Sequence, residues 1–581
     1  MRDDLHRFHV PVMGTGFTID TALRAARFGI DSVMSLGDDR LIERIRQHYA
    51  RLHDLPFVGI SRKEPDARAR RITAYLDMVD TIVSKQMKAL KALPFEPGNE
   101  KTRWFELLPE ESPWKRGYEE MRAMPEGDAR RAGERLLTDA MRAGSIDANI
   151  MTKLDRARPD AGGNAPAPEL SEAKAALRGF ARSTVEGSIV FSAGINPSLF
   201  GYLAELPEFR RDGTRPARKR VILKVSDYRS ALVQGKFLAK KGIELYEIRV
   251  ESGLNCGGHA FATDGLLLGP ILEDFRTKRG ELEGALGGPF RLTVQGGIGN
   301  HGETRRLLER FDANATGWGS PFLLVPEVSA LDDATRERLA AAGEDDVYLS
   351  EVSPLGIPFN NLRGSTSEHR THERVDAGRP GSPCPNGYLA FNQEFGEPLC
   401  TASREYQSRK LAQMGVASAP TWEDASPEVR ALYTKTCICD HLGNGALIEL
   451  GIRGDELPVA VCPGPNIAYF DRLYSLDEMV GHIYGRGASL VPASRPHMFA
   501  KELSLNVDHF EHTAAGIAPS DVKGQRRVAA YRETLEDGLA FYRRMLEEPA
   551  FPGENLDSLR AGIEAAAERI SAGATALAAE G

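Results

Sequence analysis

A histidine preceded by two glycines is the first candidate for chemistry in this sequence. The segment 251–259, ESGLNCGGH, follows the apolar run 243–250 and ends on His259. A neutral imidazole accepts a proton near pH 7, so His259 suits the removal of a proton next to an electron-withdrawing group. Gly257 and Gly258 leave room for a flat ring beside it. The alternative is a histidine that serves only in capping or in the core.

Two glycine-rich turns stand one helix apart and suit a phosphate. The first, 295–300, follows the apolar run 291–294, and the second, 316–320, follows the helical segment 301–311. Glycines let the backbone approach an anion, and a following helix N-terminus adds a favourable dipole. In a (β/α)8 barrel the loops after strands 7 and 8 commonly form such a site. The pattern predicts a phosphate site; the alternative is two tight turns without a ligand.

Five of the six cysteines fall within the loop-rich part 350–470. Iron–sulfur clusters take four thiolates, whereas structural zinc takes four thiolates, or three and an imidazole such as that of His441. Neither a standard zinc spacing nor the ferredoxin run is present, so unrelated buried thiols remain an alternative, as does zinc. We predict a [4Fe–4S] cluster. Its expected ligands are Cys384, Cys400, Cys439 and Cys462, with Cys437 as the alternate.

Alternating apolar runs and helical segments must position these residues. Residues 8–60 and the part from 187 onward show strand–helix alternation, which is typical of a parallel sheet. The stretch between them is charged and helical. We therefore expect an α/β fold, with a barrel formed by 1–60 and 186–330 and a helical insertion at 61–185. A Cys-rich region at 331–475 and a C-terminal helical region at 476–581 would follow.

Composition excludes several classes of protein. The 581 residues are 41% hydrophobic and 27% charged, with a net charge of -8. This is ordinary globular composition, and the acidic balance argues against non-specific nucleic-acid binding. The sequence has no apolar run of membrane-spanning length and no recognisable export signal. We expect a cytoplasmic protein with reduced cysteines and no nucleic-acid or membrane partner.

The motifs together resemble the nitronate monooxygenase (2-nitropropane dioxygenase-like) family of FMN-dependent TIM barrels. The Gly-Gly-His segment, the two later glycine turns, the opening segment 11–16 and the strand 221–225 are placed as in that family. The resemblance covers about 200 residues, within 8–60 and 186–330. The helical insertion and everything beyond about residue 327 have no counterpart in its simple members, and Cys256 replaces a small residue. Reaction and substrate are therefore not inherited with the fold.

By this resemblance His259 is the catalytic base of a (β/α)8 TIM barrel that binds FMN. Met13, Gly14, Thr15 and Lys224 would lie near the isoalloxazine ring, beside Gly257 and Gly258. The residues expected at the FMN phosphate are Gly296, Gly297, Gly299, Gly317, Gly319 and Ser320.

The function expected from the sequence is FMN-dependent oxidoreduction of a small organic substrate. An iron–sulfur cluster would relay single electrons between the flavin and a donor protein. The alternatives are nitronate oxidation by O2 without a cluster, an enoyl-reductase-like activity, and a zinc-stabilised scaffold that is not an enzyme. We expect the chain to form a homo-oligomer.

Overall fold

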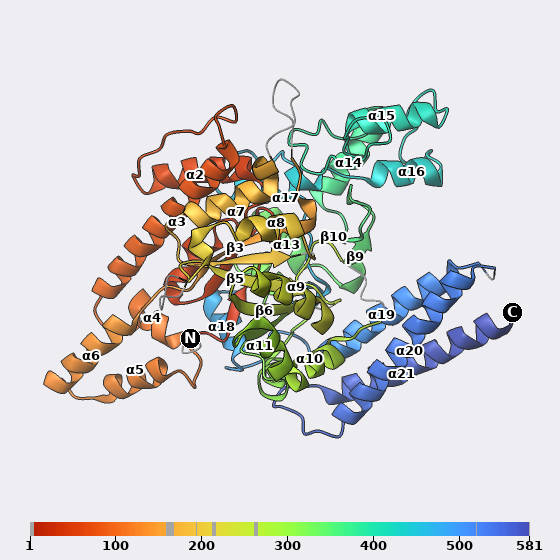
Figure 1. Ribbon diagram of the computed structural model, residues 1–581. Coiled ribbons are helices and arrows are strands. Elements are labelled where there is room, and N and C mark those ends of the chain that lie inside the picture. The colour runs from red at the N-terminus through yellow and green to blue at the C-terminus, as the bar shows by residue number, and fades with distance from the viewer. Residues whose placement is uncertain are drawn as a thin grey trace.

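Eight parallel strands close into a barrel in the order of the chain (Figure 1). The computed structural model describes residues 5–157, 168–192, 194–211, 217–251, 253–260, 265–518 and 520–579. The α/β barrel predicted from the sequence is confirmed by the strand pairing. The barrel strands are β1 (Phe8–Val10), β2 (Asp31–Ser35), β3 (Ile146–Met151), β4 (Ser188–Ser192), β5 (Arg220–Val225), β6 (Leu245–Glu251), β7 (Arg291–Gln295) and β8 (Ala315–Gly317).

The helices that connect the barrel strands begin close to the carboxyl ends of those strands. Asp38, Asp227 and Asn300 each cap such a helix by accepting hydrogen bonds from its first N–H groups. These caps fix the direction in which the chain leaves the barrel. The helices are α1 (Thr21–Ala25), α2 (Asp39–Leu52), α7 (Glu172–Arg182), α8 (Pro197–Leu203), α9 (Tyr228–Lys240), α10 (Leu268–Thr277), α11 (Arg279–Leu286) and α12 (His301–Arg305).

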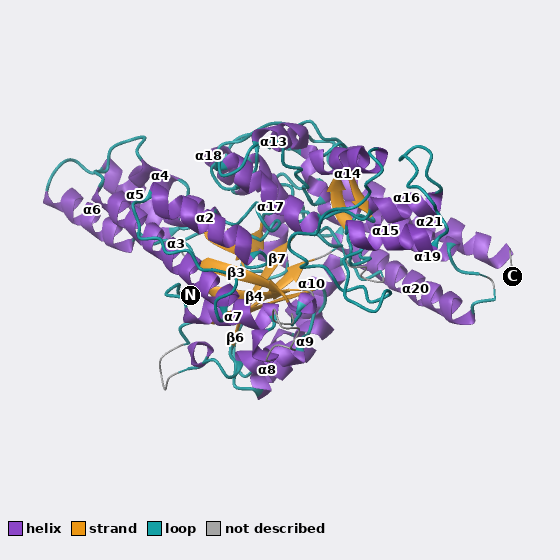
Figure 2. Cartoon of the chain, turned by 90° about the horizontal axis from the view of Figure 1, so that it is seen from above, coloured by secondary structure: helices purple, strands orange, loops and turns teal. Residues whose placement is uncertain are grey.

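The segment between β2 and β3 is a helical insertion that projects from one side of the barrel in both views (Figures 1 and 2). It holds α3 (Ala67–Ala92), α4 (Glu100–Glu106), α5 (Pro113–Ala123) and α6 (Asp128–Ala140). The predicted insertion at 61–185 needs a correction, because its second half contains β3 and α7, which belong to the barrel. β3 was missed because Asp147 and Asn149 interrupt its apolar pattern.

The chain after β8 continues into a mixed region and then a helical one. A two-stranded antiparallel sheet pairs β9 with β10. The mixed region comprises α13 (Asp333–Ala340), β9 (Val347–Ser350), β10 (Phe359–Leu362), α14 (Thr366–Asp376), α15 (Arg404–Gln413), α16 (Pro427–Thr434), α17 (Ile438–Glu449) and α18 (Leu476–Ile483). The last three helices, α19 (Met498–Ala515), α20 (Val522–Met545) and α21 (Leu556–Ala579), project on the side opposite the insertion (Figure 2).

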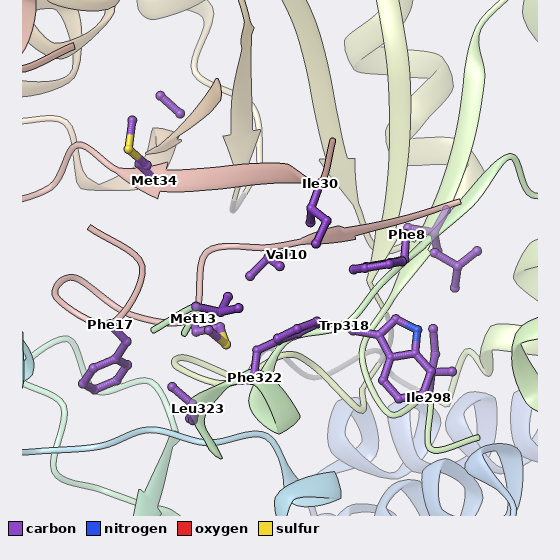
Figure 3. Close-up of a cluster of buried hydrophobic side chains, with 14 of the residues drawn as sticks. Phe8, Val10, Met13, Phe17, Ile30, Met34, Ile298, Trp318, Phe322 and Leu323 are labelled. Carbon is purple, nitrogen blue, oxygen red and sulfur yellow. The ribbon is translucent and has the colours of Figure 1, made fainter. Parts of the chain in front are cut away.

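Apolar packing ties these later regions to the barrel. Figure 3 shows Phe8 of β1 beside Trp318 and Phe322, which follow β8. All three side chains are almost fully buried, and the ring of Phe8 stacks on that of Phe322. The same core continues into α18 and α19. Burial of an aromatic side chain contributes roughly 1.5–3 kcal/mol, so this seam fixes the position of the C-terminal region.

Buried ion pairs add a second attachment of the C-terminal helices. The guanidinium of Arg306, after α12, donates to both oxygens of Glu554 at 2.8 Å and to Glu548 at 2.7 Å. The side chains of Arg306 and Glu554 are 2% and 0% exposed.

No helix in the described part of the chain is long and apolar enough to cross a membrane.

Candidate active site

The carboxyl ends of the barrel strands surround a cavity of about 580 Å3. Segments after β1 to β6 contribute to its wall, and the volume lies in the range usual for small-molecule sites. The outer wall comes from elsewhere. Arg68 and Glu172 belong to the part between β2 and β4, and the region after β8 adds Phe359, Tyr388 and Cys439. In a (β/α)8 barrel this end is where catalytic residues gather.

The structure brings together the residues that the sequence predicts near the isoalloxazine ring. These residues come from the ends of three strands, β1, β5 and β6, and all of them line the cavity: Met13, Gly14, Thr15, Lys224, Gly257, Gly258 and His259. They meet because parallel strands end at the same edge of the barrel. Cys439 and Cys462, which we predicted as metal ligands, also line this wall.

Lys224 and Glu251 form the charged centre of the cavity. The ammonium of Lys224, at the end of β5, donates to the carboxylate of Glu251, at the end of β6. Gln295 also donates to this carboxylate, at 2.7 Å, and the N–H of Cys256 donates at 3.2 Å. Burial opposes ionisation of Glu251, but the ammonium and these donors outweigh it and lower its pKa. Glu251 was missed as a site residue because its partners are distant in sequence.

His259 is held between the barrel and the β9–β10 sheet. Its Nε2 lies 2.7 Å from the hydroxyl of Ser353, and its ring meets that of Phe359 edge-on at 4.9 Å. Burial lowers the pKa of His259 to about 4. The imidazole is therefore neutral near pH 7.

Asn149 on β3 lines the cavity, and its side-chain oxygen is buried. The residue is 8% exposed, and its Oδ1 makes no hydrogen bond with any described residue. A buried acceptor without a partner is costly in a folded protein unless a ligand or water satisfies it. No pattern in the sequence pointed to Asn149, because β3 itself was not recognised.

An acidic and aromatic cluster lies at the wall of the cavity, to which Asp38, Arg68 and Tyr388 contribute. Tyr388 lies 3.0 Å from Asp38 and 3.1 Å from Asp39 through its hydroxyl, which donates to these carboxylates. Arg68 and Arg71 each bind Asp39 at 2.8 Å. This cluster links the loop at 384–389 to the barrel and to α3, so the C-terminal region completes the site.

The two glycine turns lie side by side, but neither lines the cavity. Gln295 of β7 pairs with Gly317 of β8, which places the turns together as predicted. The residues assigned to the FMN phosphate are absent from the cavity wall as the described residues form it: Gly296, Gly297, Gly299, Gly317, Gly319 and Ser320. Their role at the FMN phosphate therefore stays a prediction.

A carboxylate of the chain itself occupies the first turn. Glu303 of α12 is fully buried, and its Oε2 accepts the N–H of Gly299 at 2.7 Å. Its Oε1 accepts Arg495 at 2.7 Å and the N–H of Met498 at 2.8 Å. Arg495 also donates to the carbonyl of Gly297 at 2.6 Å. An internal ion pair thus fills the position at which the sequence suggested a phosphate.

The segment 462–466 covers the second turn and the Gly-Gly pair. The N–H of Gly464 donates to Ser320 at 2.6 Å, and that of Gly258 donates to the carbonyl of Cys462 at 3.1 Å. A Cβ on Gly257, which has a φ of 119°, would lie 2.1 Å from this carbonyl. Backbone packed this closely leaves no space for a phosphoryl group. The residues present therefore do not fit FMN in the pose that the sequence predicted.

The five clustered cysteines divide differently from the predicted ligand set. The thiol of Cys462 donates a hydrogen bond to the carbonyl of Met13, just after β1, at 3.5 Å. The thiol of Cys400 contacts that of Cys384, and the thiol of Cys439 contacts that of Cys437. Cys437 therefore belongs with this group and Cys462 does not. Across the described ranges no three His, Cys, Asp or Glu side chains converge as metal ligands, so the iron–sulfur and zinc predictions find no support.

Comparisons with known proteins reveal distant structural similarity only. No protein-family model matches the sequence, and no curated protein matches it either. FabK from Thermotoga maritima is 16% identical over 63% of this chain and 82% of its own, with a TM-score of 0.32. The enoyl reductase domain of MlnA from the macrolactin biosynthesis cluster of Bacillus amyloliquefaciens is 15% identical over 71% and 87%, with a TM-score of 0.35.

Nitroalkane oxidase from Streptomyces ansochromogenes is 12% identical over 84% of this chain and 97% of its own, with a TM-score of 0.36. These identities and TM-scores are low. The assignment of the barrel therefore rests on the strand pairing described above, and the activity has to be argued from the site.

Proposed function

We propose that this chain is an enzyme that removes a proton from carbon. Its substrate would be a small organic molecule with an acidic C–H bond, bound in the cavity at the carboxyl ends of the barrel strands. The observation that carries the proposal is the convergence of His259, Lys224 and Asn149 on one cavity. They supply a neutral base, a fixed cation and a polar amide in the wall. Together these groups suit a substrate whose carbon is next to an electron-withdrawing group.

Each residue has a distinct part in this proposal. His259 accepts the proton because its low pKa keeps it neutral at physiological pH. Lys224, held in place by Glu251, faces the negative charge that develops on the substrate. Asn149 contributes a polar side chain to the wall beside them. The apolar part of the wall, including Met13 and Phe359, limits access of water.

Replacing His259 with Ala tests the proposal directly. We expect the wild-type protein to accelerate deuterium incorporation from D2O into nitroethane, a small carbon acid, as followed by proton NMR. The exchange rate of the variant should be about 100-fold lower than that of the wild type. This is the smallest effect usual for a general base, because a base with a low pKa is weak. The wild-type rate should fall only below about pH 5, as His259 becomes protonated near pH 4.

The matched control is His369→Ala, which alters a histidine on α14 that does not contribute to the cavity wall. Its exchange rate should equal that of the wild type. An exchange rate that is the same with and without His259, in folded protein, would remove this residue from the mechanism. No acceleration by the wild type would leave the non-enzymatic scaffold as the better description.

Flavin-dependent oxidoreduction remains a second candidate, favoured by the convergence of the predicted ring-side residues on the cavity. The closed turns oppose FMN in the predicted pose. We therefore expect purified protein to be colourless and not to quench the fluorescence of added FMN. Release of one FMN per chain on denaturation would contradict this expectation and would show that the turns open. The proton-transfer test is independent of this result, because it needs no electron acceptor.

A further inference from the structure

We propose that Cys384 and Cys400 are a redox-active dithiol that forms a reversible disulfide by exchange with a small-molecule disulfide. The two cysteines lie on neighbouring loops outside the barrel cavity. The proposal goes beyond the function suggested for the cavity and does not depend on it.

Backbone pairing brings these two loops together. Ser382 donates to the carbonyl of Ala402 at 2.9 Å, and Arg404 donates to the carbonyl of Ser382 at 2.8 Å. This pairing holds Ser382 against residues 402–404, and the Cys400 thiol contacts the Cys384 sulfur. A disulfide forms only between cysteines that already lie close together.

The two thiols differ in access, which assigns their order of reaction. Cys384 is partly exposed, whereas Cys400 is buried. Cys384 also has a φ of 52°, an uncommon conformation for a residue other than glycine, which persists only where the surroundings fix it. Cys384 is therefore the thiol that an external disulfide reaches first, and Cys400 is the thiol that resolves the intermediate.

The exchange balances without a further reactant. The Cys384 thiolate attacks one sulfur of the external disulfide, which forms a mixed disulfide and releases one thiolate. Cys400 then loses its proton and attacks the Cys384 sulfur, which releases the second thiol. The protein dithiol is oxidised by two electrons, and the external disulfide is reduced to two thiols.

The arrangement favours a dithiol over a metal centre. Cys437 and Cys439 lie nearby, but the thiols touch as two pairs, and no three side chains of ligand type converge among the residues that the structure describes. The loop also leads directly to the cavity, since Tyr388 and Leu389 line its wall. Formation of the disulfide would therefore restrain the loop that contributes Tyr388 and Leu389 to the cavity wall.

The experiment is to equilibrate the full chain in buffers of reduced and oxidised glutathione, then trap and count thiols after denaturation. Six thiols should be found under reducing conditions and four under oxidising conditions, and peptide mapping should locate a Cys384–Cys400 disulfide. Cys384→Ser and Cys400→Ser should prevent it. Cys437→Ser, Cys439→Ser and Cys256→Ser are controls that should still form it.

Metal analysis of the same preparations provides the opposing outcome. Iron or zinc bound at one site per chain, and lost in Cys437→Ser as well as in Cys384→Ser, would overturn the proposal in favour of a four-thiolate centre. Six titratable thiols in every buffer would also overturn it. Mapping of the wild-type chain decides the question even if a variant fails to fold.

Discussion

Replacing Glu303 with Ala should lower the free energy of unfolding by about 3–5 kcal/mol, the usual cost of removing one partner of a buried ion pair. The Glu303 and Arg495 side chains are 0% and 4% exposed, so solvent cannot take over the lost contact. The variant would leave the buried guanidinium of Arg495 without its counter-ion, and the N–H groups of Gly299 and Met498 without their acceptor. Chemical denaturation followed by circular dichroism measures the change.

The control for this prediction is Glu309→Ala, in the short helical segment that follows α12. Glu309 pairs with Arg305 at the surface, and such exposed pairs contribute about 0–1 kcal/mol. The double variant Glu303→Gln with Arg495→Met should be less destabilised than the sum of its single changes, because no charge is left unpaired. Equal effects for Glu303→Ala and Glu309→Ala would refute the view that the turn depends on an internal anion.

Replacing Lys224 with Met should reduce the proton-exchange rate by about 10²–10³-fold, which is the usual effect of removing a group that stabilises developing negative charge. The change also takes away the cation that lowers the pKa of Glu251. That carboxyl should then titrate at a higher pH. Infrared detection of its ionisation, together with the NMR exchange assay, separates the two effects.

Two further variants distinguish a catalytic role of Lys224 from a structural one. Lys224→Met with Glu251→Gln removes both charges, so it should fold better than Lys224→Met and still exchange slowly. Lys236→Met alters an exposed lysine of α9, the helix that follows β5, and should behave as the wild type. Full exchange activity in the neutral double variant would exclude Lys224 from the reaction.

Seven of the eight barrel strands could be recognised from the sequence because each is an apolar run closed by a helical segment. β3 escaped because Asp147 and Asn149 stand where apolar residues were expected. Their side chains are buried and polar, and Asp147 accepts a hydrogen bond from Ser145 at 2.7 Å. Short-range patterns cannot reveal a polar residue whose partners are supplied by the fold.

The site residues also differ in how far they could be predicted: some follow from nearby sequence, and others depend on contacts with residues far along the chain. His259 was singled out by its Gly-Gly-His motif and Lys224 by the family resemblance, and both line the cavity. The closing of the glycine turns was not foreseen, because it depends on Arg495 and on the segment 462–466, far along the chain. The cysteine grouping failed for a similar reason: spacing favoured Cys462 over Cys437, whereas loop pairing and the start of α17 decide which thiols meet.

The late position of Arg495 has a consequence for biosynthesis. All eight strands leave the ribosome well before this residue, so during translation Glu303 has not yet met Arg495. A nascent barrel would therefore stay loosely closed at the ends of β7 and β8 until the downstream chain arrives. Ribosome-bound fragments that stop before residue 495 should be cleaved by protease near 296–303, and longer ones should resist.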